Sequence, residues 1–296
     1  MALYKYVTTG VLKHILNGSI RFTQPGAFND PFEMLPELHI PNDFVCGDIN
    51  LSFDILSPRR QTADQKLIDI PPESFDDINS RRIRAALNQS IGVLCLSKNP
   101  SSLLMWSHYA EQYAGAVVEF NEEHEFFQGQ IDVEYADYRP KQHINSYVGD
   151  GQVIPISELC VKPKDWEYES EVRIVRKLAD CKKISVDATF PVYVLELPQE
   201  CIKSVTMGER TPISAQREIY SLVKDTRIAL SLAAISNQGY EFRKELVKFS
   251  KPVSEMAPII SPRTSHIFTE RNTALGEVSR FLVDYHAMSK IVNDTV

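Results

Sequence analysis

The apolar residues at the start of the chain follow two spacings, one typical of strands and one typical of a helix. Alternating apolar positions predict short strands at residues 3–7 and 19–23. Between them, residues 9–17 predict a helix with one apolar side made of Val11, Leu12, Ile15 and Leu16. Asn17-Gly18 is a typical helix stop. The chain is therefore expected to open as strand, helix, strand.

Strands and helices remain interspersed along the rest of the chain. Patterns of the same two kinds predict strands at 92–97, 116–120, 192–197 and 201–207 and helices near 78–89, at 101–113 and at 212–222. Thr211-Pro212 is expected to be the N-cap and first position of that last helix. Residues 232–249 fit either a hairpin or a helix and a strand. These alternations favour an α+β chain.

The end of the chain has a different composition. Residues 251–266 contain three prolines and several serines and are expected to be a linker. Residues 273–292 then predict an amphipathic helix with an apolar stripe of Leu275, Val278, Phe281, Leu282, Tyr285 and Met288. That helix either packs back on the body or meets a partner, including another copy of the chain, and packing back is the more common outcome.

Composition narrows the class of protein. The hydrophobic share of 43% fits a globular protein, and no apolar run is long enough to span a bilayer. Five cysteines without Cys-x-x-Cys spacing argue against a disulfide framework or a zinc site and favour reduced thiols in the cytoplasm. The net charge of −7 and the pI near 5.6 provide no overall attraction to nucleic acid or anionic lipid.

Residues 164–176, Lys-Asp-Trp-Glu-Tyr-Glu-Ser-Glu-Val-Arg-Ile-Val-Arg, are the most informative segment. If residues 169–176 are extended, Glu169, Glu171 and Arg173 share one face, with the two carboxylates about 7 Å apart. Such a pair can position a nucleophile and stabilise a developing cation. The alternative is a solvated strand edge with a Glu–Arg pair, and this segment favours neither reading.

Common catalytic motifs are missing from the sequence. It has no glycine-rich phosphate loop, no His-Glu-x-x-His and no Gly-x-Ser-x-Gly, and His108 has no second histidine at ligand spacing, so no metal ligands are assigned. Polar and aromatic candidates remain, namely Tyr4, Lys5, Tyr6, Arg21, Asn29, Asp30, Ser97, Trp106, His108, Tyr109, Trp166, Glu169, Glu171 and Arg173. Trp106 and His108 point in different directions on one helix, so Trp106 is assigned to the core and His108 to the site.

Three blocks of the sequence resemble the signatures of a bacterial domain family of unknown function. They are Phe28-Asn29-Asp30-Pro31-Phe32-Glu33, Leu104-Met105-Trp106-Ser107-His108-Tyr109-Ala110 and Trp166-Glu167-Tyr168-Glu169-Ser170-Glu171-Val172-Arg173. More remotely, the chain resembles the ADP-ribosyltransferase superfamily. The shared features are the opening Leu-Tyr-Lys-Tyr strand, the strand at 92–97 before a serine-rich turn and a helix with Tyr109, and the late Glu-x-Glu.

The superfamily resemblance implies a fold and a set of roles. The fold would be a split, mostly antiparallel sheet in residues 1–250, with a helical insertion at about 36–90 and a C-terminal extension at 251–296. Glu171 would be catalytic, Glu169 would orient or activate the acceptor, and Tyr109 would stack on the nicotinamide of NAD. Lys5 or Tyr6 stands where the superfamily usually has His or Arg. Arg21 or Arg173 would hold the pyrophosphate, and Asn29 and Asp30 either line the pocket or cap a turn.

The expected function is ADP-ribosyl transfer from NAD, or NAD cleavage, by a bacterial effector of the toxin or phage-defence type. The acceptor, protein or nucleic acid, cannot be identified from the sequence. One alternative is a non-enzymatic module that senses a nucleotide in the same cleft. Another is a nuclease-like hydrolase that binds Mg²⁺ through Asp165, Glu169 and Glu171. A transferase needs Tyr109 and Glu171 to face one pocket, whereas a metal site needs several carboxylate oxygens to converge on one point.

Overall fold

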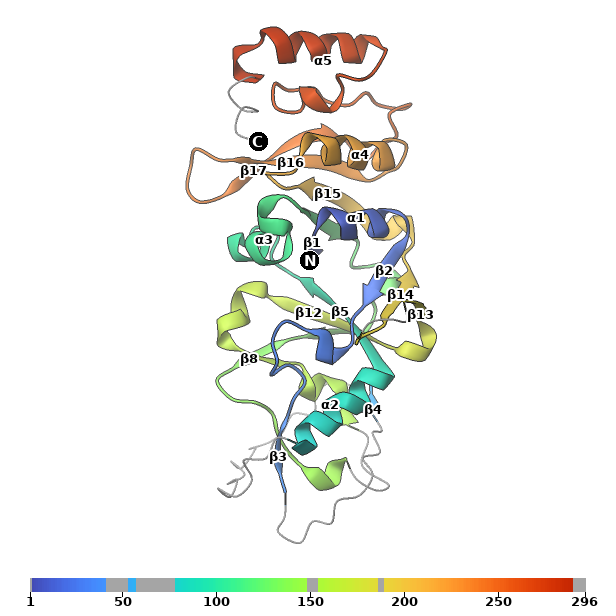
Figure 1. Cartoon of the computed structure of the whole chain (residues 1–296), viewed down its shortest axis with the longest axis vertical. Helices are drawn as coiled ribbons and strands as arrows, with labels where there is room; N and C mark the ends of the chain where they lie inside the picture. Colours follow the sequence, from blue (N-terminus) through green and yellow to red (C-terminus); the bar gives the residue numbers. More distant parts are fainter. Residues whose placement is uncertain (1, 41–52, 57–77, 148–153, 186–188, 290–296) are drawn as a thin grey trace. The chain divides into compact units, whose positions relative to one another are not determined.

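The computed structural model shows an α+β protein whose largest sheet has eight strands and is mixed but mostly antiparallel (Figure 1). The residues that it describes are 2–40, 53–56, 78–147, 154–185 and 189–289. Most of the expected insertion at 36–90 lies outside them. Within the described part of the chain, no helix has the length and apolar character needed to cross a membrane.

The chain divides into two compact units. The first comprises residues 1–19, 97–126 and 196–296, and the second comprises residues 20–96 and 127–195. Residues 251–296 thus belong to the first unit.

The first unit is built on a row of five strands. In spatial order they are β17 (Phe242–Lys248), β16 (Ala229–Ile235), β15 (Ile202–Met207), β6 (Ala116–Phe120) and β1 (Leu3–Val7). Neighbouring strands are antiparallel except β15 and β16, which are parallel. A parallel pair needs a crossover, and α4 (Ile213–Val223) provides it. The strands expected in this unit are confirmed. Residues 232–249 were expected to form either a hairpin or a helix and a strand, and they form the hairpin.

Capping hydrogen bonds and backbone angles explain where the helices of the first unit begin and end. The side chain of Thr8 accepts a hydrogen bond from Val11 N at the start of α1 (Thr9–Leu16), and Gly18, with φ of 79°, follows its end. Ser102 caps α3 (Leu103–Tyr109) in the same way. The helix expected over 101–113 was too long, because Glu111, Gln112 and Tyr113 have φ between 51° and 73°, a left-handed backbone that no α-helix contains.

Two further expectations for this unit need correction. Thr211 is not the N-cap of α4, since Pro212 holds that position and the Thr211 hydroxyl donates to the carbonyls of Ala114 and Gly115. Most of the apolar stripe of α5 (Ala274–Tyr285) is exposed to solvent and does not pack back on the unit. The buried side of the helix is formed by small residues such as Ser279, whereas Phe281 is 62% exposed. Association through this helix stays a prediction.

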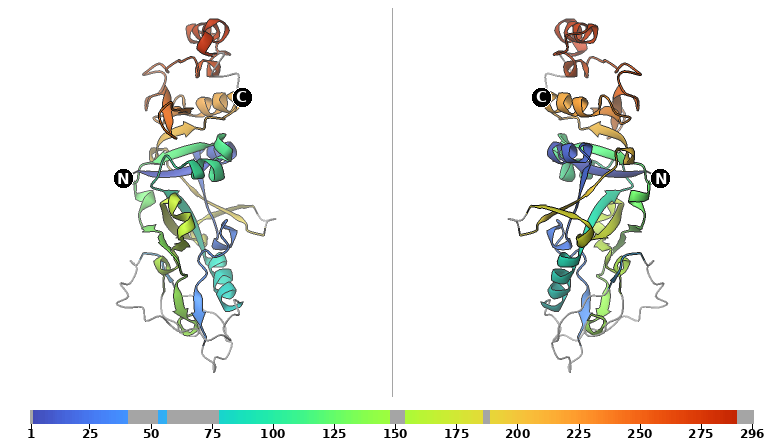
Figure 2. Two further views of the ribbon diagram at one scale, coloured as in Figure 1. Left: turned by 90° about the vertical axis from the view of Figure 1, so that its left-hand side faces the viewer. Right: turned by 90° about the vertical axis from the view of Figure 1, so that its right-hand side faces the viewer.

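The second unit contains the remaining three strands of the large sheet and several small sheets. The three strands are β5 (Ile91–Ser97), β12 (Glu171–Lys177) and β7 (Gln130–Asp132). The small sheets are β2 (Ser19–Phe22) with β14 (Val192–Glu196) and β13 (Lys182–Ser185), β3 (Glu37–His39) with β9 (Lys141–His143), β4 (Phe53–Asp54) with β10 (Ile154–Pro155), and β8 (Glu134–Ala136) with β11 (Val161–Pro163). The helix α2 (Ile78–Ser90) lies beside β3 (Figure 2). Its residues Ile83 and Leu87 join the core around Ile91 and Val93.

The glutamate segment differs from the expected single strand. Residues 164–169 form a 3-10 helix, η7 (Lys164–Glu169), which Ser170 ends with a left-handed φ of 44°. Only then does β12 begin, at Glu171. Asp165 and Glu167 lie in the first turn of η7, where carboxylates favour a helical start. The prediction that Glu169 and Glu171 share one strand face is therefore wrong.

Candidate functional site

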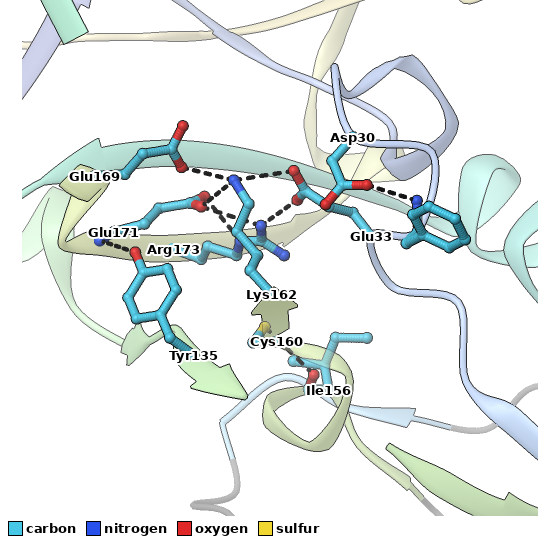
Figure 3. A network of polar contacts seen from close by, with 10 residues as sticks. Asp30, Glu33, Tyr135, Ile156, Cys160, Lys162, Glu169, Glu171 and Arg173 are labelled. Carbon is cyan, nitrogen blue, oxygen red and sulfur yellow. Dashed lines mark hydrogen bonds and ion pairs between the residues drawn. The ribbon is translucent and has the colours of Figure 1, made fainter. Parts of the chain in front are cut away.

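Five charged side chains gather at the start of β12 in the second unit (Figure 3). They are Glu33, Lys162, Glu169, Glu171 and Arg173, and we call them the charge cluster. They come from the loop before β3, from β11, from the end of η7 and from β12. None is more than 6% exposed. The alternative of a solvated strand edge is therefore wrong.

Lys162 is the centre of the cluster. Its Nζ lies 2.6 Å from Oε2 of Glu169, 3.0 Å from Oε2 of Glu171 and 3.0 Å from Oε1 of Glu33. An ammonium group has three donors, and these three carboxylates can accept all of them. A single lysine thus joins the end of η7 and the start of β12 to the loop of Glu33, which is distant in sequence.

Arg173 completes the network from the same strand as Glu171. Its Nε donates to Oε1 of Glu171 over 2.8 Å, and its Nη2 donates to Oε2 of Glu171 over 3.2 Å. Nη2 also forms an ion pair with Oε2 of Glu33. Both oxygens of Glu171 are consequently held by cations, which fixes the position of this carboxylate.

Burial and neighbouring charges affect the two glutamates in opposite ways. Burial alone raises the pKa of Glu171, but Arg173 and Lys162 outweigh it and lower the pKa to about 2. For Glu33 burial dominates over the same two cations, so its pKa is raised above 4.5. Glu171 therefore stays ionised at neutral pH, and Glu33 is protonated more readily. With all groups ionised, three carboxylates and two cations leave one negative charge in excess.

Aromatic side chains surround the cluster. The Nζ of Lys162 lies 5.1 Å from the centre of the Trp166 ring, and the guanidinium of Arg173 lies 5.3 Å from the ring of Phe28. The hydroxyl of Tyr135 accepts a hydrogen bond of 2.7 Å from the backbone N–H of Glu171. Burial, with smaller effects from the nearby glutamates, raises the pKa of Tyr135 to about 12, so the hydroxyl keeps its proton. The carboxylates thus lie in an aromatic setting.

Asp30 lies in the loop that carries Glu33, as Figure 3 shows. Its Oδ1 accepts a hydrogen bond of 2.8 Å from Phe32 N, which is the turn-capping role considered for it. Its Oδ2 is buried and, among the described residues, has no hydrogen-bond partner. Asn29 and Arg21 belong to the same unit and are exposed.

The geometry does not favour the magnesium hypothesis. The point on which the three carboxylates converge holds the ammonium of Lys162. Asp165, the third ligand of that hypothesis, is exposed. Among the described residues, no group of three or more His, Cys, Asp or Glu side chains is arranged to hold a metal ion.

The remaining candidates lie in the first unit, and two of them have structural roles. The hydroxyl of Tyr6 donates to Asn99 O over 2.9 Å and accepts from Ser102 N over 3.2 Å, which anchors the start of α3. Ser97 Oγ accepts from Asn99 N in the same turn. The prediction that Trp106 belongs to the core is confirmed, since it is 3% exposed.

The other candidate residues of the first unit differ in how exposed they are. Lys5 and Tyr109 are partly buried, and His108 is exposed, as expected for a residue outside the core. Tyr4 lines a cavity described below. Tyr109 and Glu171 belong to different units, so the expectation that they face one pocket stays a prediction.

Sequence reasoning missed the central residue of the cluster. Lys162 follows Val161 in a short strand and carries no motif. The one signal is a lysine between apolar neighbours just before a run of acidic and aromatic residues. Glu33 was part of a signature block but was not assigned to the site, and Tyr135 gave no signal at all.

In the comparison with known protein families, a family model matches part of the chain. Residues 105–174 match the model of a family described as a protein of unknown function, DUF2971. This range includes the second and third signature blocks, from Met105 to Ala110 and from Trp166 to Arg173, but not the first. No curated protein and no solved structure matches the chain. The comparisons support no relation to ADP-ribosyltransferases.

Proposed function

We propose that the charge cluster is the catalytic centre of an enzyme that cleaves the nicotinamide–ribose bond of NAD and passes the ADP-ribosyl group to water or to a macromolecular acceptor. The observation that carries this proposal is the ionised, fixed carboxylate of Glu171 within a buried group that has one excess negative charge. A negative site in an aromatic setting favours a developing cation. The mostly antiparallel sheet is compatible with the ADP-ribosyltransferase type of fold.

The reaction assigns distinct roles to the two glutamates. When the bond between C1′ and the nicotinamide nitrogen breaks, its electron pair leaves with neutral nicotinamide and the ribose gains oxocarbenium character. Glu171 stabilises that charge electrostatically. The acceptor oxygen or nitrogen then bonds to C1′ and loses a proton, which Glu169 accepts in this proposal. Lys162 and Arg173 keep both carboxylates in place.

Incubation of the protein with NAD labelled in the adenylate half, with and without cell extract, tests the proposal. Released nicotinamide measures cleavage, and label on protein or nucleic acid measures transfer. Glu169→Gln and Glu171→Gln should each lower the rate by about 10² or more. Glu167→Gln is the matched control, because Glu167 is an exposed glutamate on the same 3-10 helix.

Stability must be separated from chemistry in this experiment, since both target residues are buried. Rates are therefore compared at a temperature at which circular dichroism shows every variant to be folded. If the wild-type protein releases no nicotinamide under either condition, or if folded glutamate variants retain their rate, the enzymatic proposal fails. The toxin or phage-defence setting rests on resemblance alone and is tested by expression in a bacterial host.

A second candidate, a nucleotide-sensing module without catalysis, is favoured by one specific observation. All five charged groups of the cluster already have partners within the protein and are almost excluded from solvent. Such a network is well suited to a rigid scaffold. Saturable NAD binding by calorimetry without release of nicotinamide would support this candidate over the enzyme.

A further inference from the structure

A small cavity lies on one face of the sheet in the first unit. It has a volume of about 90 Å³, and Tyr4, Trp106, Glu119, Ser204, Phe242 and Lys244 are among the residues that line it. Tyr4, Glu119 and Ser204 are cross-strand neighbours on β1, β6 and β15. Neighbours in register point to the same side of a sheet, so these three side chains form one row, and Trp106 from α3 lines the same cavity.

The size of the cavity limits what it can hold. A cavity of about 150 Å³ accepts benzene, and this one is smaller at about 90 Å³. It is therefore too small to enclose a trimethylammonium group, which is about as large as benzene, so a head group of that size enters only in part, and a dinucleotide is excluded. A ligand must place a small end in the cavity and extend the rest of its structure toward the solvent.

The chemistry of the walls points to a cation. Glu119 is oriented by a hydrogen bond of 2.7 Å from Ser204 Oγ to its Oε2, and among the described residues it has no ion-pair partner. Burial is the main cause of the raised pKa of Tyr4, and the charges of Glu119 and Glu122 add smaller contributions in the same direction. The exposed Lys244 is the opposing charge among the lining residues.

The aromatic residues add a second attraction for a cation. The rings of Trp106 and Phe242 are 6.0 Å apart and steeply inclined, and Tyr4 lines the same cavity. Several aromatic rings around a small space, together with a carboxylate, are typical of sites that bind quaternary ammonium groups. A neutral apolar group would leave the carboxylate of Glu119 desolvated without compensation.

We propose that this cavity binds an organic ammonium head group, such as the trimethylammonium end of a small molecule. Glu119 neutralises the charge, and Tyr4, Trp106 and Phe242 contact the methyl groups that enter the cavity. Lys244, an exposed residue of the lining, weakens binding of a purely cationic molecule. This site is separate from the NAD reaction proposed above and does not depend on it.

Choline and its neutral isostere 3,3-dimethyl-1-butanol provide a matched pair of probes. The chain has two tryptophans, so a full-length Trp166→Phe protein leaves Trp106 as the single tryptophan and reports on the cavity by its fluorescence. Choline chloride should change that fluorescence saturably, with ionic strength held constant by sodium chloride. The neutral alcohol should not compete. Equal binding of both compounds would mean an apolar cavity without cation selectivity and would overturn the proposal.

Two substitutions with opposite expected effects on choline affinity make the test more specific. Glu119→Gln should weaken choline binding about tenfold or more, whereas Lys244→Gln should strengthen it because a repelling charge is removed. Glu123→Gln is the control, since Glu123 is an exposed glutamate just beyond β6. If Glu119→Gln fails to fold, Ser204→Ala removes the orienting hydrogen bond and should weaken binding in the same direction. No saturable response to choline, or unchanged affinity in folded variants, would refute the inference.

Discussion

Replacing Glu171 by glutamine should destabilise the second unit by about 3 kcal/mol at neutral pH. A pKa lowered from 4.5 to about 2 corresponds to this amount of differential stabilisation of the charged form, at about 1.36 kcal/mol per pKa unit. Losing one partner of a buried ion pair generally costs about 3–5 kcal/mol. The lower end applies here because removing Glu171 also relieves its repulsion of Glu33.

The net charge that remains in the cluster predicts that Lys162→Met will destabilise the second unit more than Glu171→Gln does. The glutamine variant leaves two carboxylates and two cations, a balanced set. The methionine variant leaves three buried carboxylates with Arg173 as the one cation of the cluster, an excess of two negative charges. The expected loss therefore reaches the upper end of the range of about 3–5 kcal/mol or exceeds it.

The pH dependence provides a second check. Because the pKa of Glu171 is lowered in the folded state, its contribution is complete above about pH 4.5 and is lost as pH falls toward about 2. The difference between the wild type and Glu171→Gln should thus shrink by about 1.4 kcal/mol per pH unit in that window. Glu33 acts in the opposite direction, since its raised pKa favours the fold as pH falls toward 4.5.

Urea unfolding followed by Trp166 fluorescence measures these values in the relevant unit. All variants carry Trp106→Phe, so the remaining tryptophan lies beside Lys162. A local reporter is needed because a chain with two compact units need not unfold in one step. Glu167→Gln is the exposed control and should change stability by no more than about 0.5 kcal/mol. A loss below about 1 kcal/mol for Glu171→Gln would refute the view that the charge cluster stabilises this unit.

Two further predictions concern the first unit. Trp106→Ala should cost about 3–5 kcal/mol, since a 3% exposed indole leaves a cavity, whereas the exposed His108→Ala should leave the melting temperature nearly unchanged. Thermal unfolding by circular dichroism compares them, and a strongly destabilised His108 variant would contradict its exposed position. Gly208→Ala should cost about 1–3 kcal/mol or more, because a Cβ there would lie 2.0 Å from a backbone carbonyl oxygen. Gly10→Ala, whose Cβ would meet nothing closer than 3.9 Å, should be neutral or stabilising, and equal effects of the two glycine variants would refute the steric reasoning.

The sequence by itself determined the longer helices and strands, but not the short strands of the second unit such as β8 and β11. The spacing of apolar residues predicted β1, α1, β2 and β6 within a residue or two, because helix and strand periods are local properties of the chain. Trp106 could be assigned to the core for the same reason. The class of the fold followed from the alternation of these elements.

Tertiary structure determined the features that local sequence patterns could not predict. The left-handed backbone at Glu111 ends α3, and Ser170 places Glu169 outside β12, although neither residue is one for which a left-handed conformation is common. The charge cluster could not be predicted from local patterns either. Glu33 and Arg173 are 140 positions apart, and Lys162 carries no motif, so their contacts depend on which segments the fold brings together. Burial changed the chemistry as well, because cations within hydrogen-bond distance keep Glu171 ionised where a buried carboxylate would otherwise take up a proton.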